Sequence, residues 1–312
     1  MADAAPLIGT DLAPIPAGAA AEWFAGAGGA RLRAGLFPAT GAAKGSVVLS
    51  PGRTEPIEKY FEVVDELRAR GFAVLVHDWR GQGLSHRLLA DRLLGHANGS
   101  ADFMADYQAL LSTFADRLPK PWIALGHSMG GCLTLLALAR GEARFSAAFL
   151  SAPMLGLQLG GIPGPVARAI AAGLKLIGLG GAPAVRTPAA PVPFAANILT
   201  HDRARYERNE AQVAACPDLA LGAPTWGWLD FALCATRELA TGPGTARIAM
   251  PATILTAAEE RLVDNAAARR VAARMSGARF VEIPGAYHEL AQETDDVRAV
   301  FWREFDALAA RL

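Results

Sequence analysis

Short apolar runs alternate with longer amphipathic stretches through the first half of the chain. In the longer stretches apolar residues recur three and four positions apart, which is the spacing of one helix face. The short runs are apolar throughout, as is typical of parallel strands that helices cover on both sides. The predicted strands are residues 47–49, 72–76, 122–125 and 147–150, and the predicted helices are 57–70, 102–118 and 133–139.

The same alternation returns near the C-terminus, after a segment of different character. Residues 155–245 are first rich in Gly and Pro, then charged and helical, then aromatic. We interpret this segment as a cap or lid inserted over the sheet of an α/β fold, with residues 1–154 and 246–312 forming the two parts of the core. The remaining predicted elements are strands at 252–255 and 280–283, helices at 265–275 and 296–312, and one or two edge strands around 30–37.

The composition limits the function classes that remain. The 312 residues include 30 Lys and Arg against 30 Asp and Glu, so nothing favours a nucleic-acid partner. With 52% hydrophobic residues the chain is not disordered. Cys132, Cys216 and Cys234 are too few and too scattered for a disulfide framework or a zinc site. The N-terminus has no Lys or Arg before its apolar stretch and so does not resemble a signal peptide, which favours a cytoplasmic protein.

One motif carries a candidate nucleophile. Residues 126–130 read Gly-His-Ser-Met-Gly, and they lie between a predicted strand and a predicted helix. A G-x-S-x-G sequence in this setting forms a strained turn that exposes the serine hydroxyl above the sheet. A glycine-rich turn with an ordinary serine is the alternative, but the flanking strand and helix favour Ser128 as the nucleophile.

A serine nucleophile needs a base, and His288 is the best placed histidine. In this arrangement the histidine comes last in the chain, on the loop after the final strand. His288 follows the predicted strand 280–283 directly, whereas His127 is adjacent to Ser128 and should point away from its hydroxyl. We therefore expect His288 to accept the proton of Ser128.

The third member of a triad is a carboxylate that orients the histidine. It should follow the strand at 252–255, where Glu259, Glu260 and Asp264 compete. Glu260 is favoured because it lies near the strand end, whereas helix capping would explain Asp264 without catalysis. Asp264 remains the main alternative acid.

Two backbone N–H groups are needed to bind the negative charge that develops on the substrate oxygen. One should belong to Met129, which follows the nucleophile. The other should come from the loop Ser50-Pro51-Gly52-Arg53 after an early strand, where Arg53 N–H would point at that oxygen.

Together these motifs resemble the monoacylglycerol lipase and bacterial lysophospholipase branch of the α/β-hydrolases, a family that includes serine aminopeptidase-like enzymes. The resemblance implies a mostly parallel central sheet, helices on both faces and a helical cap. In that branch the acid usually opens a D-R-L-x-D run, which residues 260–264 match with Glu in place of Asp. It also implies that Asp264 supports the turn at the nucleophile through His127. The matching segments are GHSMGG, HDWRGQGLS, SPGRTEPIEKY, EERLVDN and GAYHEL, with LTHDRARYERN and LALGAPTWGWL favouring the lysophospholipase side.

These residues predict a serine hydrolase that acts on a lipid-like ester without metal or other cofactor. Trp226, Trp228 and Phe194 are candidates for the substrate pocket. We expect transient contact of the cap with the inner face of the membrane, and no obligate protein partner is evident. A charged helix in the insertion, with Arg203, Arg205 and Arg208, is interpreted as a solvated face.

Two other functions stay open. An aminopeptidase would need acidic residues on the cap to hold the substrate amine, and Glu207 or Glu210 could serve. A non-catalytic binding protein of the same fold would usually have lost a member of the triad, whereas here every position can be filled.

Overall fold

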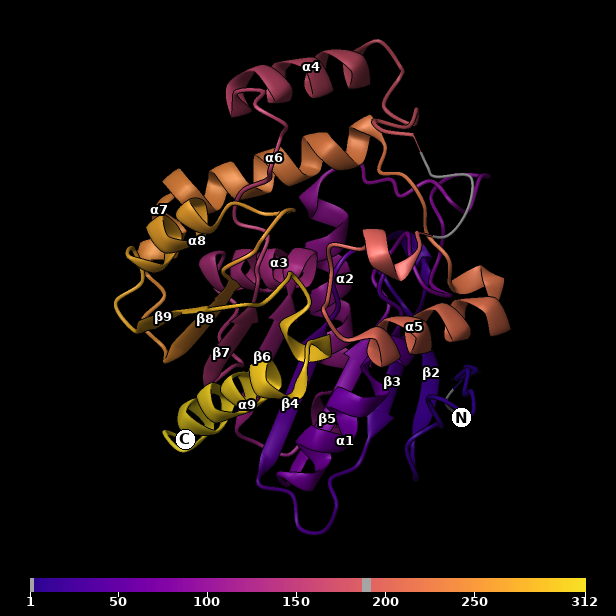
Figure 1. The fold of residues 1–312 in the computed structure, drawn as a ribbon, viewed down its shortest axis with the longest axis vertical. Coiled ribbons are helices and arrows are strands. Elements are labelled where there is room, and N and C mark those ends of the chain that lie inside the picture. Colours follow the sequence, from indigo (N-terminus) through magenta and orange to yellow (C-terminus); the bar gives the residue numbers. More distant parts are fainter. Residues whose placement is uncertain (1–2, 187–191) are drawn as a thin grey trace.

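The computed structural model describes residues 3–186 and 192–312. Among these residues nine strands form one sheet (Figure 1). The strands are β1 Asp3–Ala4, β2 Ala20–Ala25, β3 Arg31–Phe37, β4 Gly45–Ser50, β5 Phe72–His77, β6 Trp122–His127, β7 Ala147–Ser151, β8 Ala252–Ala257 and β9 Ala278–Ile283. Their order across the sheet is β1-β2-β3-β5-β4-β6-β7-β8-β9. The pairs from β5 to β9 are parallel, whereas β1, β2 and β3 join as antiparallel strands, so the predicted mostly parallel α/β fold is confirmed.

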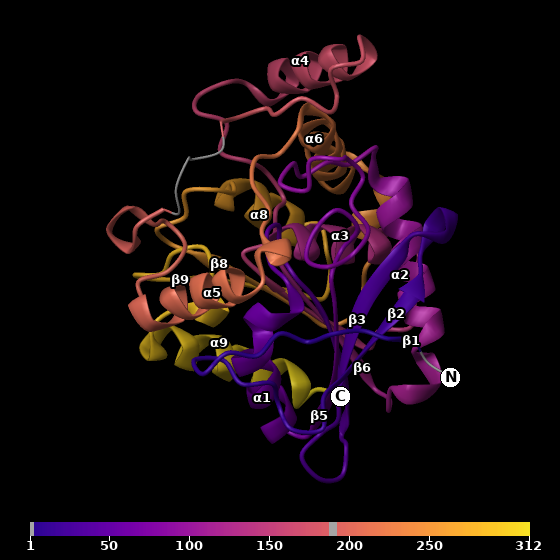
Figure 2. The same ribbon diagram turned by 90° about the vertical axis from the view of Figure 1, so that its right-hand side faces the viewer.

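Helices cover both faces of the sheet, and each face has its own apolar core. Helices α1 (Phe61–Ala69) and α9 (Asp295–Ala309) pack on one face. Helices α2 (Ser100–Thr113), α3 (Ser128–Ala139) and α8 (Asn265–Ala272) pack on the other (Figure 2). The central strands are buried throughout, which is why their sequences are continuously apolar and do not alternate.

The segment between β7 and β8 lies above the carboxyl ends of the parallel strands. It contains α4 (Gly164–Leu176), α5 (Arg203–Ala215), α6 (Trp226–Thr241) and the short α7 (Pro243–Ala246). Helix α6 packs against α3, and α4 lies on α6 as the outermost helix of the molecule (Figure 1). This segment coincides with the predicted insertion at 155–245, and its function as a cap stays a prediction. In the part of the chain that the structure describes, no helix has the length and apolar character needed to span a membrane.

Several element boundaries differ from those predicted. Residues 57–70 form a 3-10 turn at Ile57–Tyr60 followed by α1, and Asp78 from outside the helix accepts the N–H of Ile57. Helix α3 begins earlier than expected, at Ser128, because Gly130 and Gly131 hide the helical pattern. The N-terminal part supplies three strands instead of one or two.

Candidate active site

Ser128 occupies the tight turn between β6 and α3. Its backbone φ is +49°, in the left-handed region that residues with a side chain rarely adopt. The turn is possible because glycines follow it: a Cβ on Gly130 would lie 2.0 Å from the carbonyl oxygen of Ser50 on β4. Such a strained, closely packed turn holds the hydroxyl of Ser128 at the carboxyl end of the sheet.

The structure brings Ser128, His288 and Glu260 into one chain of hydrogen bonds. Nε2 of His288 lies 2.9 Å from Oγ of Ser128, and Nδ1 of His288 lies 2.7 Å from Oε2 of Glu260. A carboxylate only accepts, so Nδ1–H donates to Glu260 and Nε2 is left to accept from the serine hydroxyl. Both the His288 and the Glu260 side chains are buried.

The second carboxylate oxygen of Glu260 also accepts hydrogen bonds, which stabilise the ionised form. Its Oε1 accepts the backbone N–H groups of Arg261, Leu262 and Val263 at 2.9, 2.8 and 3.3 Å. Burial alone would raise the pKa of Glu260, but the hydrogen bond with His288 and those with the N–H groups of Leu262 and Val263 lower it. The loop thus presents a fixed, charged acceptor to His288.

The other two candidate acids have different surroundings. Asp264 is the N-cap of α8, where its Oδ1 accepts the N–H groups of Ala266 at 2.8 Å and Ala267 at 3.1 Å. Glu259 is half exposed, and one of its carboxylate oxygens lies 3.9 Å from Nε2 of His201. Neither carboxylate contacts His288 within the described residues.

His127 points away from the nucleophile, as expected, but its partners are not the expected ones. Its Nδ1 lies 3.1 Å from the carbonyl oxygen of Ser151, and its Nε2 lies 3.7 Å from Oε1 of Glu55. The implied route from Asp264 through His127 is therefore wrong, because the two side chains share no contact among the described residues and Asp264 caps α8. Burial lowers the pKa of His127 to about 4, so this imidazole stays neutral.

The loop 51–53 after β4 is held by side chains on several sides. Trp79 Nε1 donates to the carbonyl oxygen of Pro51 at 2.9 Å, and Gln82 Nε2 donates to that of Gly52 at 2.7 Å. The N–H of Gly52 is already bound to Glu55, so it is not available to a substrate. The N–H of Arg53 donates to no other described residue, and Met129 lies in the first turn of α3, where N–H groups have no partner within the helix.

Sequence reasoning missed a buried charged cluster beneath this loop, formed by Glu55, Lys59 and Glu289. Lys59 Nζ lies 3.0 Å from Glu55 Oε1 and 2.5 Å from Glu289 Oε1. Burial alone would raise the pKa of Glu55, but the charge of Lys59 and the hydrogen bonds from Tyr60 and Lys59 contribute to a larger opposing effect, and the pKa falls to about 2. The spacing of Glu55 and Lys59, one helical turn apart, was the available signal. The cluster connects the loop 51–53 to the residue that follows His288.

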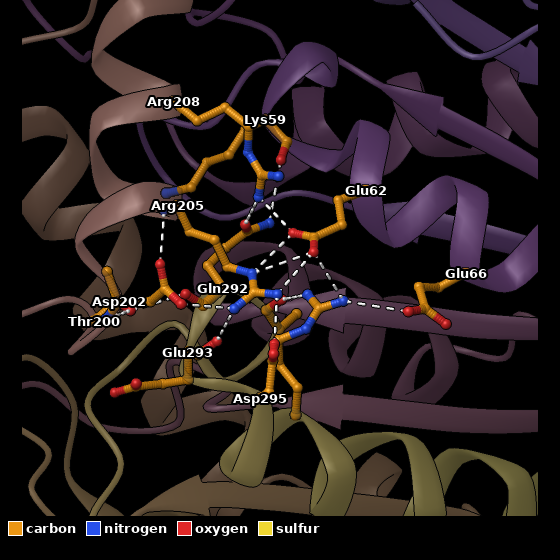
Figure 3. A network of polar contacts seen from close by, with 12 residues as sticks. Lys59, Glu62, Glu66, Thr200, Asp202, Arg205, Arg208, Gln292, Glu293 and Asp295 are labelled. Carbon is orange, nitrogen blue, oxygen red and sulfur yellow. Dashed lines mark hydrogen bonds and ion pairs between the residues drawn. The ribbon is translucent and has the colours of Figure 1, made fainter. Parts of the chain in front are cut away.

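The insertion is also fixed to the loop that carries His288, as Figure 3 shows. Arg205 of α5 donates to both carboxylate oxygens of Glu62 at 2.8 and 2.9 Å, and to the carbonyl oxygen of Glu293 at 2.9 Å. Arg208 pairs with the same Glu62 at 2.5 Å. The expectation of a solvated face is therefore wrong for Arg205 and Arg208, whereas Arg203 is exposed.

The predicted pocket residues lie in different places. Trp228 is buried next to the nucleophile, with Nε1 donating to Sδ of Met129 at 3.4 Å. Trp226 begins α6, and its N–H is bound to the carbonyl oxygen of Ala182. Phe194 packs on Tyr206, with ring centres 5.6 Å apart, and belongs to the outer part of the insertion. Of the three, Trp228 is the one with a contact to the Ser128 turn among the described residues.

A parallel sheet with a serine turn at its centre and a histidine after its last strand defines an α/β-hydrolase. Comparison with known families agrees: residues 41–295 match the family described as serine aminopeptidase, S33, and the chain belongs to it. The family name does not settle the substrate, because its characterised relatives differ.

Two curated relatives are lipid hydrolases by name. Lysophospholipase L2 of Escherichia coli strain K12 is 38% identical over 273 residues, which cover 81% of this chain and 77% of the relative. The monoacylglycerol lipase of Mycolicibacterium smegmatis is 31% identical over 184 residues, or 57% of this chain and 64% of the relative. Among solved structures, a monoglyceride lipase from Saccharomyces cerevisiae covers 93% of this chain and 95% of its own at a TM-score of 0.72. At 18% identity this last likeness shows the fold alone.

Proposed function

We propose that this protein is a serine hydrolase that cleaves the carboxylic ester of a single-chain lipid, either a lysophospholipid or a monoacylglycerol. The observation that carries the proposal is the hydrogen-bonded chain Ser128–His288–Glu260. The lysophospholipase and monoacylglycerol lipase relatives support the substrate class.

In the proposed mechanism His288 Nε2 takes the proton of Ser128 while the serine oxygen attacks the ester carbonyl carbon. The carbonyl oxygen gains a negative charge, and the N–H groups of Arg53 and Met129 bind it. His288, now charged and stabilised by Glu260, returns its proton to the leaving alcohol as the C–O bond breaks. A water molecule then attacks the acyl-enzyme while His288 takes its proton, and His288 returns that proton to the serine oxygen as the fatty acid leaves and the Ser128 hydroxyl is restored.

The exposed side of α4 supports contact between the insertion and a lipid surface. Leu176 is 88% exposed and Ile177 is 69% exposed, which is unusual for large aliphatic side chains beside each other. We propose that this end of α4 touches a membrane or micelle from which the substrate enters. We also propose that Trp226, Trp228 and Phe194 contact the acyl chain, with Trp228 best supported by its place beside Met129. The cytoplasmic location stays a prediction.

An aminopeptidase remains the second candidate because of the family to which the chain belongs. The arrangement of the two candidate amine-binding residues does not favour it. Glu207 is exposed and already paired with Arg203 at 3.1 Å, and Glu210 belongs to the same helix α5. A non-catalytic binding protein is disfavoured because the serine, histidine and carboxylate are all present and in contact.

A panel of substrates tests the proposal. We expect kcat/KM to rise from acetyl to dodecanoyl esters, because each buried methylene adds about 0.8 kcal/mol. Lysophospholipids and monoacylglycerols should be cleaved faster than aminoacyl amides. A kcat/KM that is flat or falling with chain length would contradict a lipid substrate, and faster cleavage of the amides would establish the aminopeptidase.

A further inference from the structure

The side chain of Arg53 is partly buried beneath the insertion and has no ionic partner among the described residues. Its Nη2 donates to the carbonyl oxygen of Gly222, and its central carbon lies 5.3 Å from the centre of the Trp228 ring. Nε is buried and has no hydrogen-bond partner. Burial lowers the pKa of Arg53 to about 10, which still leaves the group charged at neutral pH.

Two other arginines have more partners than Arg53, although the buried Nε of Arg87, like that of Arg53, has no hydrogen-bond partner among the described residues. Arg33 pairs with both Glu58 and Asp78, each at 2.7 Å. Arg87, like Arg53, lacks a carboxylate partner within the described chain, but several carbonyl oxygens accept its N–H groups. These belong to Gly81, Gly83, Arg92, Asp218 and Ala220. Arg53 has one such acceptor, so most of its five N–H groups have no acceptor among the described residues.

The location of Arg53 makes this unsatisfied charge relevant to the substrate. Arg53, Met129 and Trp228 line one small cavity of about 10 Å³, next to the turn that carries Ser128. The other cation on this cavity is Arg80, which Asp106 neutralises through two hydrogen bonds of 2.8 Å. Arg53 is therefore the cation lining this cavity that has no carboxylate partner among the described residues, so an anionic ligand could pair with it.

We propose that the Arg53 side chain binds the phosphate of a lysophospholipid whose ester is attacked by Ser128. This inference rests on the proposed function and selects one of its two substrate classes. In a lysophospholipid a short glycerol chain joins the ester to the phosphate. In Arg53 a side chain of similar length separates the guanidinium from the backbone N–H, which would bind the ester oxygen.

Phosphate binding would exchange a weak partner for a strong one. The cavity has space for no more than about one water molecule, so its lining residues must move apart and the contact of Arg53 with Gly222 must break when the headgroup enters. A carbonyl–arginine contact is then replaced by charge-assisted hydrogen bonds to phosphate oxygens, for which the planar guanidinium is suited. A cation–π contact with the face of the Trp228 ring holds the guanidinium of Arg53 in place. A monoacylglycerol offers no anion and gains nothing from this exchange.

The test compares two substrates that share one acyl chain, 1-palmitoyl lysophosphatidylcholine and 1-palmitoylglycerol, in the same detergent micelles. The measured quantity is the ratio of their kcat/KM values. We expect Arg53→Gln to lower this ratio at least about tenfold, because bonds to a charged group are lost for one substrate alone. Arg53→Lys, which keeps the charge but not the planar fork, should recover part of the ratio.

Arg87→Gln is the matched control. Arg87 is also a partly buried arginine that donates to carbonyl oxygens of the insertion, at Asp218 and Ala220, but it does not line the cavity. If Arg53 only anchored the insertion, the two glutamine variants would affect both substrates alike. We expect the ratio in Arg87→Gln to stay within about twofold of the wild-type ratio, whatever the change in absolute rate.

The outcomes separate the two proposals. An unchanged ratio in Arg53→Gln, or an equal change in Arg87→Gln, overturns the phosphate site and leaves the hydrolase intact. If wild-type protein cleaves neither substrate, the proposed function itself fails. Should Arg53→Gln not fold, non-hydrolysable ether analogues of the two lipids decide the matter on wild-type protein. The phospholipid analogue must inhibit at least about tenfold more strongly, and equal inhibition overturns the inference.

Discussion

The backbone N–H of Gly52 donates to Oε2 of Glu55 over 2.5 Å, which fixes the peptide just before Arg53. Glu55 is itself buried and held by the hydroxyl of Tyr60 at 2.5 Å and the ammonium of Lys59 at 3.0 Å. Because Lys59 also binds Glu289, one cluster supports both the proposed oxyanion loop and the loop of His288.

Glu55→Gln tests whether this cluster positions the proposed oxyanion N–H groups. Glutamine is nearly isosteric but uncharged, so Gly52 and Lys59 are held less firmly and the Arg53 N–H drifts from its place. We expect kcat to fall about tenfold or more with KM little changed, because the lost interaction acts in the transition state. The measurement is steady-state hydrolysis of a p-nitrophenyl ester.

Glu304→Gln serves as the matched control for Glu55→Gln. Glu304 of helix α9 is another buried carboxylate in an ion pair, and its partner is Arg279 of strand β9. The kcat of the Glu304→Gln variant should stay within about twofold of the wild-type value. A similar kcat in Glu55→Gln and Glu304→Gln would show that the Glu55 cluster is structural only.

Paired variants test the choice of acid. Glu260→Gln should lower kcat by several orders of magnitude with KM little changed, because Glu260 stabilises His288 most when the imidazole is charged. Asp264→Asn should cost about 1 kcal/mol of unfolding free energy through its cap on α8, and less in rate. The reverse result, an inactive Asp264→Asn beside a nearly normal Glu260→Gln, would make Asp264 the triad member.

The buried His77 predicts a pH dependence of stability. Burial lowers its pKa from an ordinary value of 6.5 to about 3, so between these values the unfolded chain binds more protons than the folded one. His77 then removes stability as pH falls, by about 1.4 kcal/mol per pH unit. His77→Gln should lack this contribution, so urea unfolding between about pH 4 and pH 6 should show a shallower slope than wild type. Equal slopes would show that folding does not lower the pKa of His77.

The exposed end of α4 predicts a substrate-dependent effect. Leu176→Asp with Ile177→Asp should weaken sedimentation with phosphatidylglycerol vesicles and reduce hydrolysis of vesicle-bound lysophospholipid about tenfold. Hydrolysis of a short water-soluble ester should stay the same, since neither residue is near Ser128 in sequence or in the contacts of the described chain. Leu12→Asp, at a 61% exposed leucine of the N-terminal segment, is the control and should change neither rate. Loss of both rates in the α4 variant would indicate damage to the fold instead of a lost surface contact.

The strands could be predicted because burial on both faces leaves a continuous apolar run, as in β6 and β7. Ser128 and His288 could be selected because their chemistry depends on position at a strand end, which local sequence reveals. The first residue of α3 could not be predicted, because close packing against β4 requires glycines, and glycines in a sequence resemble a loop.

Contacts between distant parts of the chain left no local pattern to read. Lys59 and Glu289 are 230 positions apart, so no spacing rule links them. Helix α5 is polar all round and resembled a solvent-exposed helix, yet its Arg205 is satisfied by Glu62 of α1. The buried charge pairs that support the site were thus the part that sequence patterns could not show.

Covalent labelling of Ser128 tests the central claim most directly. Wild-type protein and Ser128→Ala are treated with a fluorophosphonate, which reacts with activated serines, and the modified peptide is located by mass spectrometry. The account predicts one adduct per chain, on Ser128, and none in Ser128→Ala, whose ester hydrolysis should also be lost. A wild-type protein that hydrolyses esters without any adduct on Ser128, or a Ser128→Ala variant that keeps more than about a tenth of that activity, would contradict the account.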